Sequence, residues 1–327
     1  MIDVALDVRE TSHMSIGMRQ YVRELAARLP RVAADLRFQA FGRGDNFDWA
    51  EQIEMPLHIL RARPRVVHFT SPFAPLAVPA PYVVTIHDLI DLEFPQWAKP
   101  KARWYYRTAV RHIARAARCV ITDDPSTAAD IARFSHGPAE RIAVVPLGVD
   151  LPALVPVARS VPYAIYAGNR RPHKDVGTIV EAWAQLDPDI ELDLVITGDE
   201  DPELLAVRRA RGRLLFVGEL SHAEVLRWIA GAAVLVHAAL REGFGLPLLE
   251  AVRLGTPVVA TSSAVPHDLA QHVRTFPPKD AAAMARAIEN VVRGSQPAMA
   301  DAARAATAML TWDRCAAMTA DVYRRFL

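Results

Sequence analysis

The stretch VLVHAALREGFGLPLLEAVRLG, residues 234–255, decides the fold expected for the second half of the chain. A short apolar run ends at His237, and a loop with Glu242 and two glycines follows it. Pro247 suits the first turn of a helix, because its missing N–H would have no helical partner there, and Gly255 suits the helix end. A buried strand that leads through a glycine-bearing loop into a helix is a unit of an α/β domain.

The loop of this stretch also carries groups for binding a ligand. Gly243 and Gly245 let the backbone approach a ligand closely, and the helix start offers unpaired N–H groups at the positive end of the helix dipole. Glu242 beside those amides suits sugar hydroxyls, which donate hydrogen bonds to carboxylates, better than it suits phosphate. Two structural roles are also open, with Glu242 as a helix cap and Glu250 on a solvated helix face.

The same alternation of strand and helix runs along the whole chain. Strands are expected at residues 2–8, 36–41, 66–69, 82–86, 119–122, 142–145, 163–167, 192–197, 214–217, 234–237 and 257–261. Helices are expected at residues 18–29, 103–117, 126–134, 178–185, 223–229, 247–254 and 280–292. Such alternation predicts mostly parallel sheets that are covered by helices on both faces.

Prolines 146, 152, 156 and 162 punctuate an irregular stretch, which we interpret as a linker. A chain of 327 residues also suits two cores better than one. We therefore predict a Rossmann-like domain at residues 1–150 and a second one at residues 151–309. Two doubly wound domains in tandem are expected to face a central cleft at the carboxyl ends of their strands.

Composition limits the function classes. The net charge is +1, so nothing in the overall charge attracts nucleic acid. Two cysteines are too few for a disulfide framework or a thiolate metal site, which fits a reducing compartment. The amino terminus does not have the pattern of a signal peptide, and the apolar run 230–240 is shorter than the roughly 20 residues of a membrane span. We expect a cytoplasmic protein that is soluble or lies on the membrane surface.

A second candidate loop follows the first strand of the second domain, where folds of this class bind phosphate. Gly168 opens this loop, and Arg170, Arg171 and Lys174 follow it. Three cations there would stabilise the charge that grows on a leaving diphosphate. The alternative is a solvated basic loop.

The first domain offers two further candidates. Gly17 precedes a helix, where its amide could bind the same diphosphate, although a plain turn glycine is equally open. His87 ends a strand and is expected to point into the cleft, and the alternative is a structural histidine. Asp88 beside it would fix the loop.

Several segments together resemble one enzyme family. EGFGLPLLE at 242–250 resembles the Glu-x7-Glu segment of the retaining glycosyltransferases of family 4, which have the GT-B fold. YAGNRRPHKD at 166–175 resembles the donor-phosphate loop of that family, and SIGMRQY at 15–21 resembles its first loop. HDL at 87–89 matches its His-Asp-Leu segment. Residues 310–327 resemble its closing helix, which would pack back on the first domain.

The resemblance implies a metal-independent hexosyltransferase that needs no cofactor besides a nucleotide-diphosphate sugar as co-substrate. It assigns His87 and Glu242 to catalysis. The other residues that it assigns are Gly17, Arg170, Arg171 and Lys174 at the diphosphate, Gly243, Phe244, Gly245, Leu246 and Glu250 at the donor sugar and ribose, and Val217, Gly218 and Leu220 near the nucleobase. Which of the two arginines contacts the diphosphate stays open.

The first-loop and His-Asp-Leu pieces are most similar to bacterial mannosyltransferases of polysaccharide and O-antigen assembly. GDP-mannose is therefore the favoured donor, with UDP- and dTDP-sugars open, and a saccharide or lipid-linked saccharide is the expected acceptor. His173, Asp175 and His267 depart from the family pattern near the donor pocket. Residues 99–115 combine cationic and aromatic side chains, which suits either peripheral contact with the cytoplasmic face of the inner membrane or an ordinary amphipathic helix.

Three other readings compete with this one. Asp199 with Asp201, or Asp187 with Asp189, could form the Asp-x-Asp metal motif of the other major glycosyltransferase fold. A non-hydrolysing sugar-nucleotide epimerase has a similar two-domain fold. The third alternative is a non-catalytic subunit that binds a nucleotide sugar.

Overall fold

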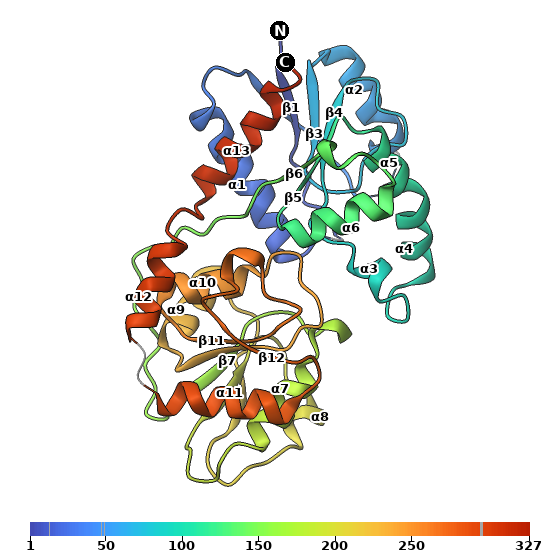
Figure 1. The fold of residues 1–327 in the computed structure, drawn as a ribbon. Helices are drawn as coiled ribbons and strands as arrows, with labels where there is room; N and C mark the ends of the chain where they lie inside the picture. The colour runs from blue at the N-terminus through green and yellow to red at the C-terminus, as the bar shows by residue number, and fades with distance from the viewer. Residues whose placement is uncertain (13, 47, 49, 295–296) are drawn as a thin grey trace. The chain divides into compact units, whose positions relative to one another are not determined.

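The computed structural model describes residues 1–12, 14–46, 48, 50–294 and 297–327. The chain divides into two compact units (Figure 1). Unit 1 comprises residues 1–148 and 310–327, and unit 2 comprises residues 149–309. Among the described residues, no helix combines the length and apolar character needed to cross a bilayer.

Unit 1 is built on a six-stranded sheet with the order β2-β1-β3-β4-β5-β6, and its neighbouring strands pair in parallel. Its strands are β1 (Val4–Asp7), β2 (Phe38–Phe41), β3 (Val66–Phe69), β4 (Tyr82–Thr85), β5 (Cys119–Thr122) and β6 (Ile142–Val144). Strands β1, β3, β4 and β5 are buried along their whole length. Such continuous burial is typical of parallel strands that are covered on both faces.

The helices of unit 1 are α1 (Ile16–Val32), α2 (Met55–Ala62), α3 (Ile90–Glu93), α4 (Pro100–Tyr105), α5 (Arg111–Ala116), α6 (Pro125–Ser135) and α13 (Trp312–Arg324). Two π-helical segments, η1 (Ala50–Glu54) and η2 (Tyr106–Val110), and one 3₁₀ turn, η3 (Ala139–Arg141), complete the unit. The single helix predicted at residues 103–117 is therefore three segments, α4, η2 and α5, because the ladder widens to π geometry in its middle.

The carboxyl-terminal helix α13 belongs to unit 1 and packs on α1 (Figure 1). Asp313 near the start of α13 accepts hydrogen bonds from Arg28 at 2.6 Å and from Arg31 at 2.5 Å. Gly148 lies where the chain leaves the sheet and passes the start of α13. A Cβ at that position would lie 2.0 Å from the backbone of Thr311, so this close approach requires glycine.

Unit 2 is built on a second six-stranded sheet, with the order β12-β11-β10-β7-β8-β9. The pairs are again parallel. Its strands are β7 (Tyr163–Tyr166), β8 (Asp193–Ile196), β9 (Leu214–Phe216), β10 (Val234–His237), β11 (Val258–Thr261) and β12 (Arg274–Phe276). The first strand of this unit, β7, pairs with both the second, β8, and the fourth, β10. This is the Rossmann strand order, with its reversal between β7 and β10.

The helices of unit 2 are α7 (Val176–Ala184), α8 (Pro202–Leu205), α9 (His222–Gly231), α10 (Leu246–Leu254), α11 (Ala281–Arg293) and α12 (Pro297–Ala306), with 3₁₀ turns η4 (Pro172–Lys174) and η5 (His267–Leu269). Helix α10 begins after Gly245, carries Pro247 in its first turn and ends at Gly255, which has a φ of 82°. The prediction for residues 234–255 is therefore confirmed. Strand β12 and helices α8 and α12 were not predicted.

Candidate functional site

Two loops of unit 2 flank the point at which the strand order reverses. The loop after β7 contains residues 167–175, and the loop after β10 contains residues 238–245. Because β7 and β10 are parallel neighbours, both loops leave the sheet at its carboxyl edge. Open α/β sheets bind their ligands outside this edge at the reversal point. The two sequence segments with the most candidate residues therefore meet where the fold favours a site.

Three ionisable side chains join these two loops. The ammonium of Lys174 forms an ion pair and hydrogen bond with Oε1 of Glu242, and Nε2 of His237 lies 2.7 Å from the same oxygen. The side chains are 14% exposed for Lys174, 11% for Glu242 and 3% for His237. A carboxylate that is shared by a cation and an imidazole, and still reachable from solvent, is available to a ligand.

Glu242 is ionised in this cluster. Burial opposes its charge, but the Lys174 ammonium and the hydrogen bond to His237 outweigh burial and hold the pKa of Glu242 well below its ordinary value of 4.5. The carboxylate therefore accepts hydrogen bonds at neutral pH and cannot donate one. This suits Glu242 to bind hydroxyl groups.

Local contacts hold the first loop in place. The Leu240 N–H donates to the backbone oxygen of His173 at 2.8 Å, which ties the two loops together. The ring of Tyr166 stacks on that of His237, with centroids 6.1 Å apart. Asp175 adopts a φ of 48°, a left-handed conformation that Asp and Asn tolerate better than most residues, and it starts α7. His173 is buried, and burial is the main reason that its pKa falls to about 4.

The two candidate arginines lie differently. Arg170 donates from Nη1 to the backbone oxygen of Asp199 at 2.6 Å, and its guanidinium lies over the ring of Phe216, 5.3 Å from the centroid. Arg171 is exposed, and its hydrogen bonds are made by its backbone: its N–H donates to the side chain of Asn169 at 3.2 Å, and its oxygen accepts from the Lys174 N–H at 2.8 Å. Within the described residues, the guanidinium of Arg171 thus makes no polar contact.

The start of α10 is shaped by glycine. Gly245 has a φ of 73°, and a Cβ there would lie 2.6 Å from Cδ1 of Leu248. No side chain caps this helix, so the capping role considered for Glu242 is not observed. Phe244 and Leu246 are buried on either side of Gly245, which fixes the position of the loop.

The second glutamate of the motif is also buried. Glu250 is 3% exposed, so the alternative that placed it on a solvated helix face is excluded. Nε2 of His222, at the start of α9, lies 2.7 Å from Oε1 of Glu250. The carboxylate of Glu250 is thus buried against the ring of His222, whose side chain is 41% exposed.

The residues predicted near the nucleobase follow β9. Val217, Gly218 and Leu220 are half-buried. Gly198 donates from its N–H to the Gly218 oxygen at 2.8 Å, which joins this loop to the one after β8. Both loops leave the sheet at its carboxyl edge, on the side of β7 away from β10.

Two predicted residues belong to unit 1. His87 is 8% exposed and follows β4, and its Nδ1 lies 2.6 Å from Oδ2 of Asp123, which follows β5. Gly17 is in the first turn of α1, one turn before Tyr21, whose ring meets that of His87 edge-on at 4.7 Å. Asp88 accepts a hydrogen bond from the Ile90 N–H at 3.1 Å, which confirms its role in fixing the loop.

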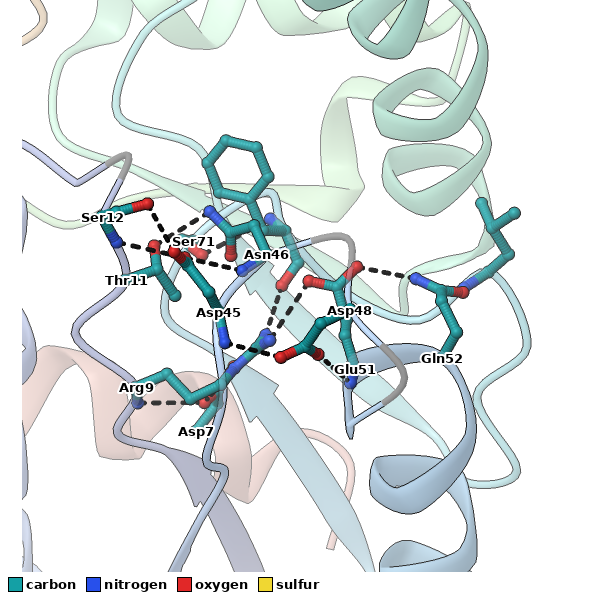
Figure 2. Close-up of polar contacts among 12 residues, drawn as sticks. Asp7, Arg9, Thr11, Ser12, Asp45, Asn46, Asp48, Glu51, Gln52 and Ser71 are labelled. Atoms are coloured by element: carbon teal, nitrogen blue, oxygen red, sulfur yellow. Dashed lines mark hydrogen bonds and ion pairs between the residues drawn. The ribbon is translucent and has the colours of Figure 1, made fainter.

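A buried charge cluster lies at the reversal point of the sheet of unit 1, between β1 and β3 (Figure 2). The guanidinium of Arg9 contacts Asp7 at 2.8 Å, Glu51 at 3.1 Å and the backbone oxygen of Phe73 at 2.7 Å. These three charged side chains are at most 2% exposed. Arg9 therefore ties β1 to η1 and to the loop after β3.

Further polar groups lie beside this cluster, buried ones at Thr11 and Asn46 and more exposed ones at Ser12 and Asp45. Ser12 donates from Oγ to Asp45 at 2.5 Å, and Asn46 donates to Oγ1 of Thr11 at 2.9 Å. Figure 2 shows these side chains next to the Arg9 cluster. The carboxyl edge of unit 1 thus has accessible hydroxyl and carboxylate groups at Ser12 and Asp45, with the amide of Asn46 buried beside the ionic cluster.

The two Asp-x-Asp candidates have structural partners. Asp187 pairs with Arg293, and Asp201 caps α8 by accepting from the N–H groups of Glu203 and Leu204. Within the described part of the chain, no group of three or more His, Cys, Asp or Glu side chains is placed to hold a metal ion.

The basic segment 99–115 has a buried aromatic side chain, as an amphipathic helix would, and also an exposed aromatic one, as a membrane-contacting helix would. Tyr105 is buried and Trp104 is 66% exposed. Arg111, His112 and Arg115 line a surface hollow on the same segment. The structure therefore combines an inward aromatic with an outward cationic and aromatic surface.

Sequence reasoning missed several of these residues. His237 was recognised only as a strand end, and His222 and Asp123 were not considered. For His237 and Asp123 a signal existed, because a polar residue at or just after the carboxyl end of a buried parallel strand faces the ligand edge. Asp7 carries the same signal as the last residue of β1, but the pairing of Arg9 with Glu51, 42 positions further along the chain, gave none.

Comparison with known proteins agrees with the fold. Residues 30–153 match the family model described as Glycosyltransferase Family 4, and residues 161–293 match the model described as Glycosyl transferases group 1. WaaG, described as a glycosyltransferase involved in lipopolysaccharide biosynthesis, superimposes with a TM-score of 0.70 at 16% identity over 98% of this chain and 99% of that one.

The curated sequence relatives align with only part of this chain and part of their own length. The O-antigen chain mannosyltransferase B of Escherichia coli is 23% identical over 265 residues, 74% of this chain and 70% of that protein. A D-inositol 3-phosphate glycosyltransferase of Nocardioides sp. is 29% identical over 252 residues, 65% of this chain and 55% of that protein. The chain therefore spans less than two thirds of some of its curated relatives.

The two family matches do not overlap, and each falls largely within one Rossmann-type unit. The chain is thus a member of the glycosyltransferases with the GT-B fold, with a Family 4 match in its first half and a group 1 match in its second.

Proposed function

We propose that the chain transfers a hexosyl group, with retention of anomeric configuration, from a nucleoside-diphosphate sugar to a saccharide acceptor. One observation carries the proposal: Lys174, His237 and Glu242 meet at the strand reversal of unit 2, next to the glycine-shaped start of α10. A cation for phosphate and a carboxylate for hydroxyls lie side by side, as a sugar diphosphate requires.

The diphosphate is assigned to Lys174, Arg171 and Arg170. Lys174 and Arg171 lie on the loop after β7, and Arg171 has a guanidinium free to take a bidentate phosphate contact. Cationic groups that gain strength as the leaving diphosphate takes up charge lower the barrier to transfer. This clamp serves the purpose that a bridging metal serves elsewhere, so we propose that transfer needs no metal.

The donor sugar is assigned to Glu242 and the backbone of Gly243 to Leu246. Both contacts of the Glu242 carboxylate fall on Oε1, which directs Oε2 to a sugar hydroxyl. Glu250 is assigned to the ribose, with His222 holding the carboxylate in place. Val217, Gly218 and Leu220 are assigned to the nucleobase.

Unit 1 is assigned a second set of contacts. His87 is proposed to act at the reacting face of the donor sugar, and Gly17 to offer a backbone amide to the diphosphate. The polar edge around Ser12, Asp45 and Asn46 is proposed to bind hydroxyls of the acceptor, because it lies at the strand reversal of that sheet.

The donor is proposed to be GDP-mannose, with UDP- and dTDP-sugars as the alternatives. The E. coli relative is a mannosyltransferase, which supports mannose. The proposed acceptor is a saccharide or a lipid-linked saccharide. The exposed Trp104 and the cations of residues 99–115 would then place the enzyme on the cytoplasmic face of a membrane. Co-sedimentation with phosphatidylglycerol vesicles but not phosphatidylcholine vesicles would support that placement.

The test is a transfer assay with a panel of sugar nucleotides and saccharide acceptors, followed by NMR of the product anomer. The proposal predicts an acceptor-dependent product with retained configuration, in the presence or absence of a chelator. Conversion of the donor sugar without acceptor would instead indicate an epimerase. Tight nucleotide binding without transfer to any acceptor would indicate a binding subunit.

A further inference from the structure

The side chains of His87 and Asp123 are brought together by the register of two neighbouring strands. Parallel strands β4 and β5 pair Thr85 with Ile121, and the Ile86 N–H donates to the Ile121 oxygen at 2.9 Å. Two residues further along each strand, side chains return to the same face. This brings the imidazole of His87 to the carboxylate of Asp123, with Nδ1 and Oδ2 at 2.6 Å.

A buried network fixes the ring from the other side. Tyr21 packs edge-on against His87, and its hydroxyl lies 2.9 Å from Oγ1 of Thr85. The same Thr85 oxygen lies 2.8 Å from Nε2 of His68, and Nδ1 of His68 lies 2.6 Å from the hydroxyl of Tyr323. The position of the His87 ring is therefore set by β3, β4, α1 and α13 together.

Two atoms of the pair remain unused. Nε2 of His87 and Oδ1 of Asp123 are buried and have no hydrogen-bond partner among the described residues. The residues are only 8% and 2% exposed. Buried polar atoms are almost always paired, because an unpaired one loses its contact with water without compensation. Both atoms lie near the carboxyl edge of a parallel sheet, where ligands bind.

We propose that Asp123 is a positioning residue for His87. Its carboxylate accepts a hydrogen bond from the Nδ1–H of His87, and this orientation presents the buried Nε2 of the ring to a hydroxyl of the donor sugar. This inference rests on the proposed function. A hydroxyl can donate to neutral Nε2 or accept from its protonated form, so either state keeps a hydrogen bond. Asp123 itself need not touch the sugar.

Few of the described groups around His87 influence its protonation besides Asp123. Burial opposes protonation of His87, but the charge of Asp123, with a smaller contribution from Asp88, outweighs it and raises the pKa of His87. Burial lowers the pKa of His68 to about 3, which keeps that ring neutral at neutral pH. Burial also raises the pKa of Tyr21 and of Cys315, so neither carries charge near neutral pH. Among the described residues, the charges that raise the pKa of His87 are therefore those of Asp123 and Asp88.

The experiment is ¹H–¹⁵N NMR of the full chain with ¹⁵N-labelled histidine, recorded across pH without ligand. His87→Gln assigns the signal. The wild type is expected to keep a proton on Nδ1 throughout, and Asp123→Asn is expected to lower the pH at which His87 titrates. Asp124→Asn, the same change at the next residue, preserves a helix cap and is expected to shift the titration of His87 much less, because the charge of Asp124 acts on Asp123 rather than directly on His87.

Two results would overturn the inference: an unprotonated Nδ1 in the wild type, or equal titration of His87 in the wild type and Asp123→Asn. If Asp123→Asn does not fold, the wild-type spectrum alone tests the inference, because it shows whether the proton of the His87 ring is on Nδ1. These spectra do not depend on activity, so they stand even if no donor is transferred.

Activity gives a second readout. Asp123→Asn is expected to lower kcat about 10- to 100-fold, by analogy with the range found when a side chain that orients a metal-binding histidine is removed. The KM for the sugar nucleotide should stay nearly constant. An unchanged kcat beside a shifted titration would contradict the positioning role.

Discussion

The ammonium of Lys174 and the carboxylate of Glu242 are in contact, although 68 residues separate them in the sequence. Each follows a different strand, and only the parallel pairing of β7 with β10 brings them together. The contact places a cation that can bind phosphate next to a carboxylate that can accept hydrogen bonds from hydroxyls, both within unit 2. The proposed donor site depends on this pair.

Glu242→Gln is expected to lower kcat about 10²- to 10³-fold, because it removes the charge that binds the donor sugar in the transition state. The amide has nearly the same shape, so the fold should persist. Steady-state transfer and circular dichroism check both points. Glu191→Gln, an exposed glutamate just before β8 at the amino end of the sheet, is the matched control. Equal rates in Glu242→Gln and wild type would remove Glu242 from the site.

Arg171→Ala is expected to weaken nucleoside-diphosphate binding by about 1.5–3 kcal/mol, the contribution of a hydrogen bond to a charged group. Arg170→Ala should cost less, because Arg170 already bonds the Asp199 oxygen and covers the Phe216 ring. Isothermal titration calorimetry with GDP and UDP compares the two variants. A larger loss in Arg170→Ala would reverse the assignment of the two arginines.

His68 should make folding stability depend on pH. Burial lowers its folded pKa from 6.5 to about 3. Between these values the unfolded chain binds a proton that the folded chain does not, so stability rises with pH, by at most about 1.4 kcal/mol per unit for one proton. His68→Gln should flatten this part of the curve. Urea unfolding at pH 4.5 to 7.5 measures it, and an unchanged slope would show that His68 does not titrate as described.

Arg9→Met is expected to lower the free energy of unfolding by about 3–5 kcal/mol, because it leaves Asp7 and Glu51 buried without their cation. Arg43→Met is the matched control. Arg43 pairs with Glu54 at 3.2 Å, but its side chain is 85% exposed, so water screens that pair and little change is expected. Similar losses in the two variants would argue against a stabilising ionic centre at Arg9.

Much of the fold followed from local patterns. Strands β3, β5 and β10 have the predicted bounds, because continuous apolar runs of this length between polar loops mark buried parallel strands. The start and end of α10 followed from Pro247 and Gly255. The π-helical middle of residues 103–117 could not be predicted, because a widened ladder has no periodicity of its own in the sequence.

The candidate site was only partly predictable. Glu242, Lys174 and the glycines stand in recognisable loops. The contacts of Glu242 with His237 and of His87 with Asp123 could not be predicted in this way. They are determined by which strands are neighbours and by the register of those strands. Neighbouring strands β4 and β5 are separated by 33 residues, so no local pattern pairs them. Strand order, rather than composition, determines these contacts.

The most direct test is a thermal-shift measurement of wild type and Lys174→Met with GDP, UDP and dTDP. One of the three is expected to stabilise the wild type by about 2.7 kcal/mol at a hundred times its dissociation constant, and Lys174→Met should lose most of this gain. Lys279→Met, the same change on an exposed turn of unit 2, should keep it. Equal stabilisation of wild type and Lys174→Met, or no stabilisation by any of the three, would contradict a diphosphate site at Lys174 and Glu242.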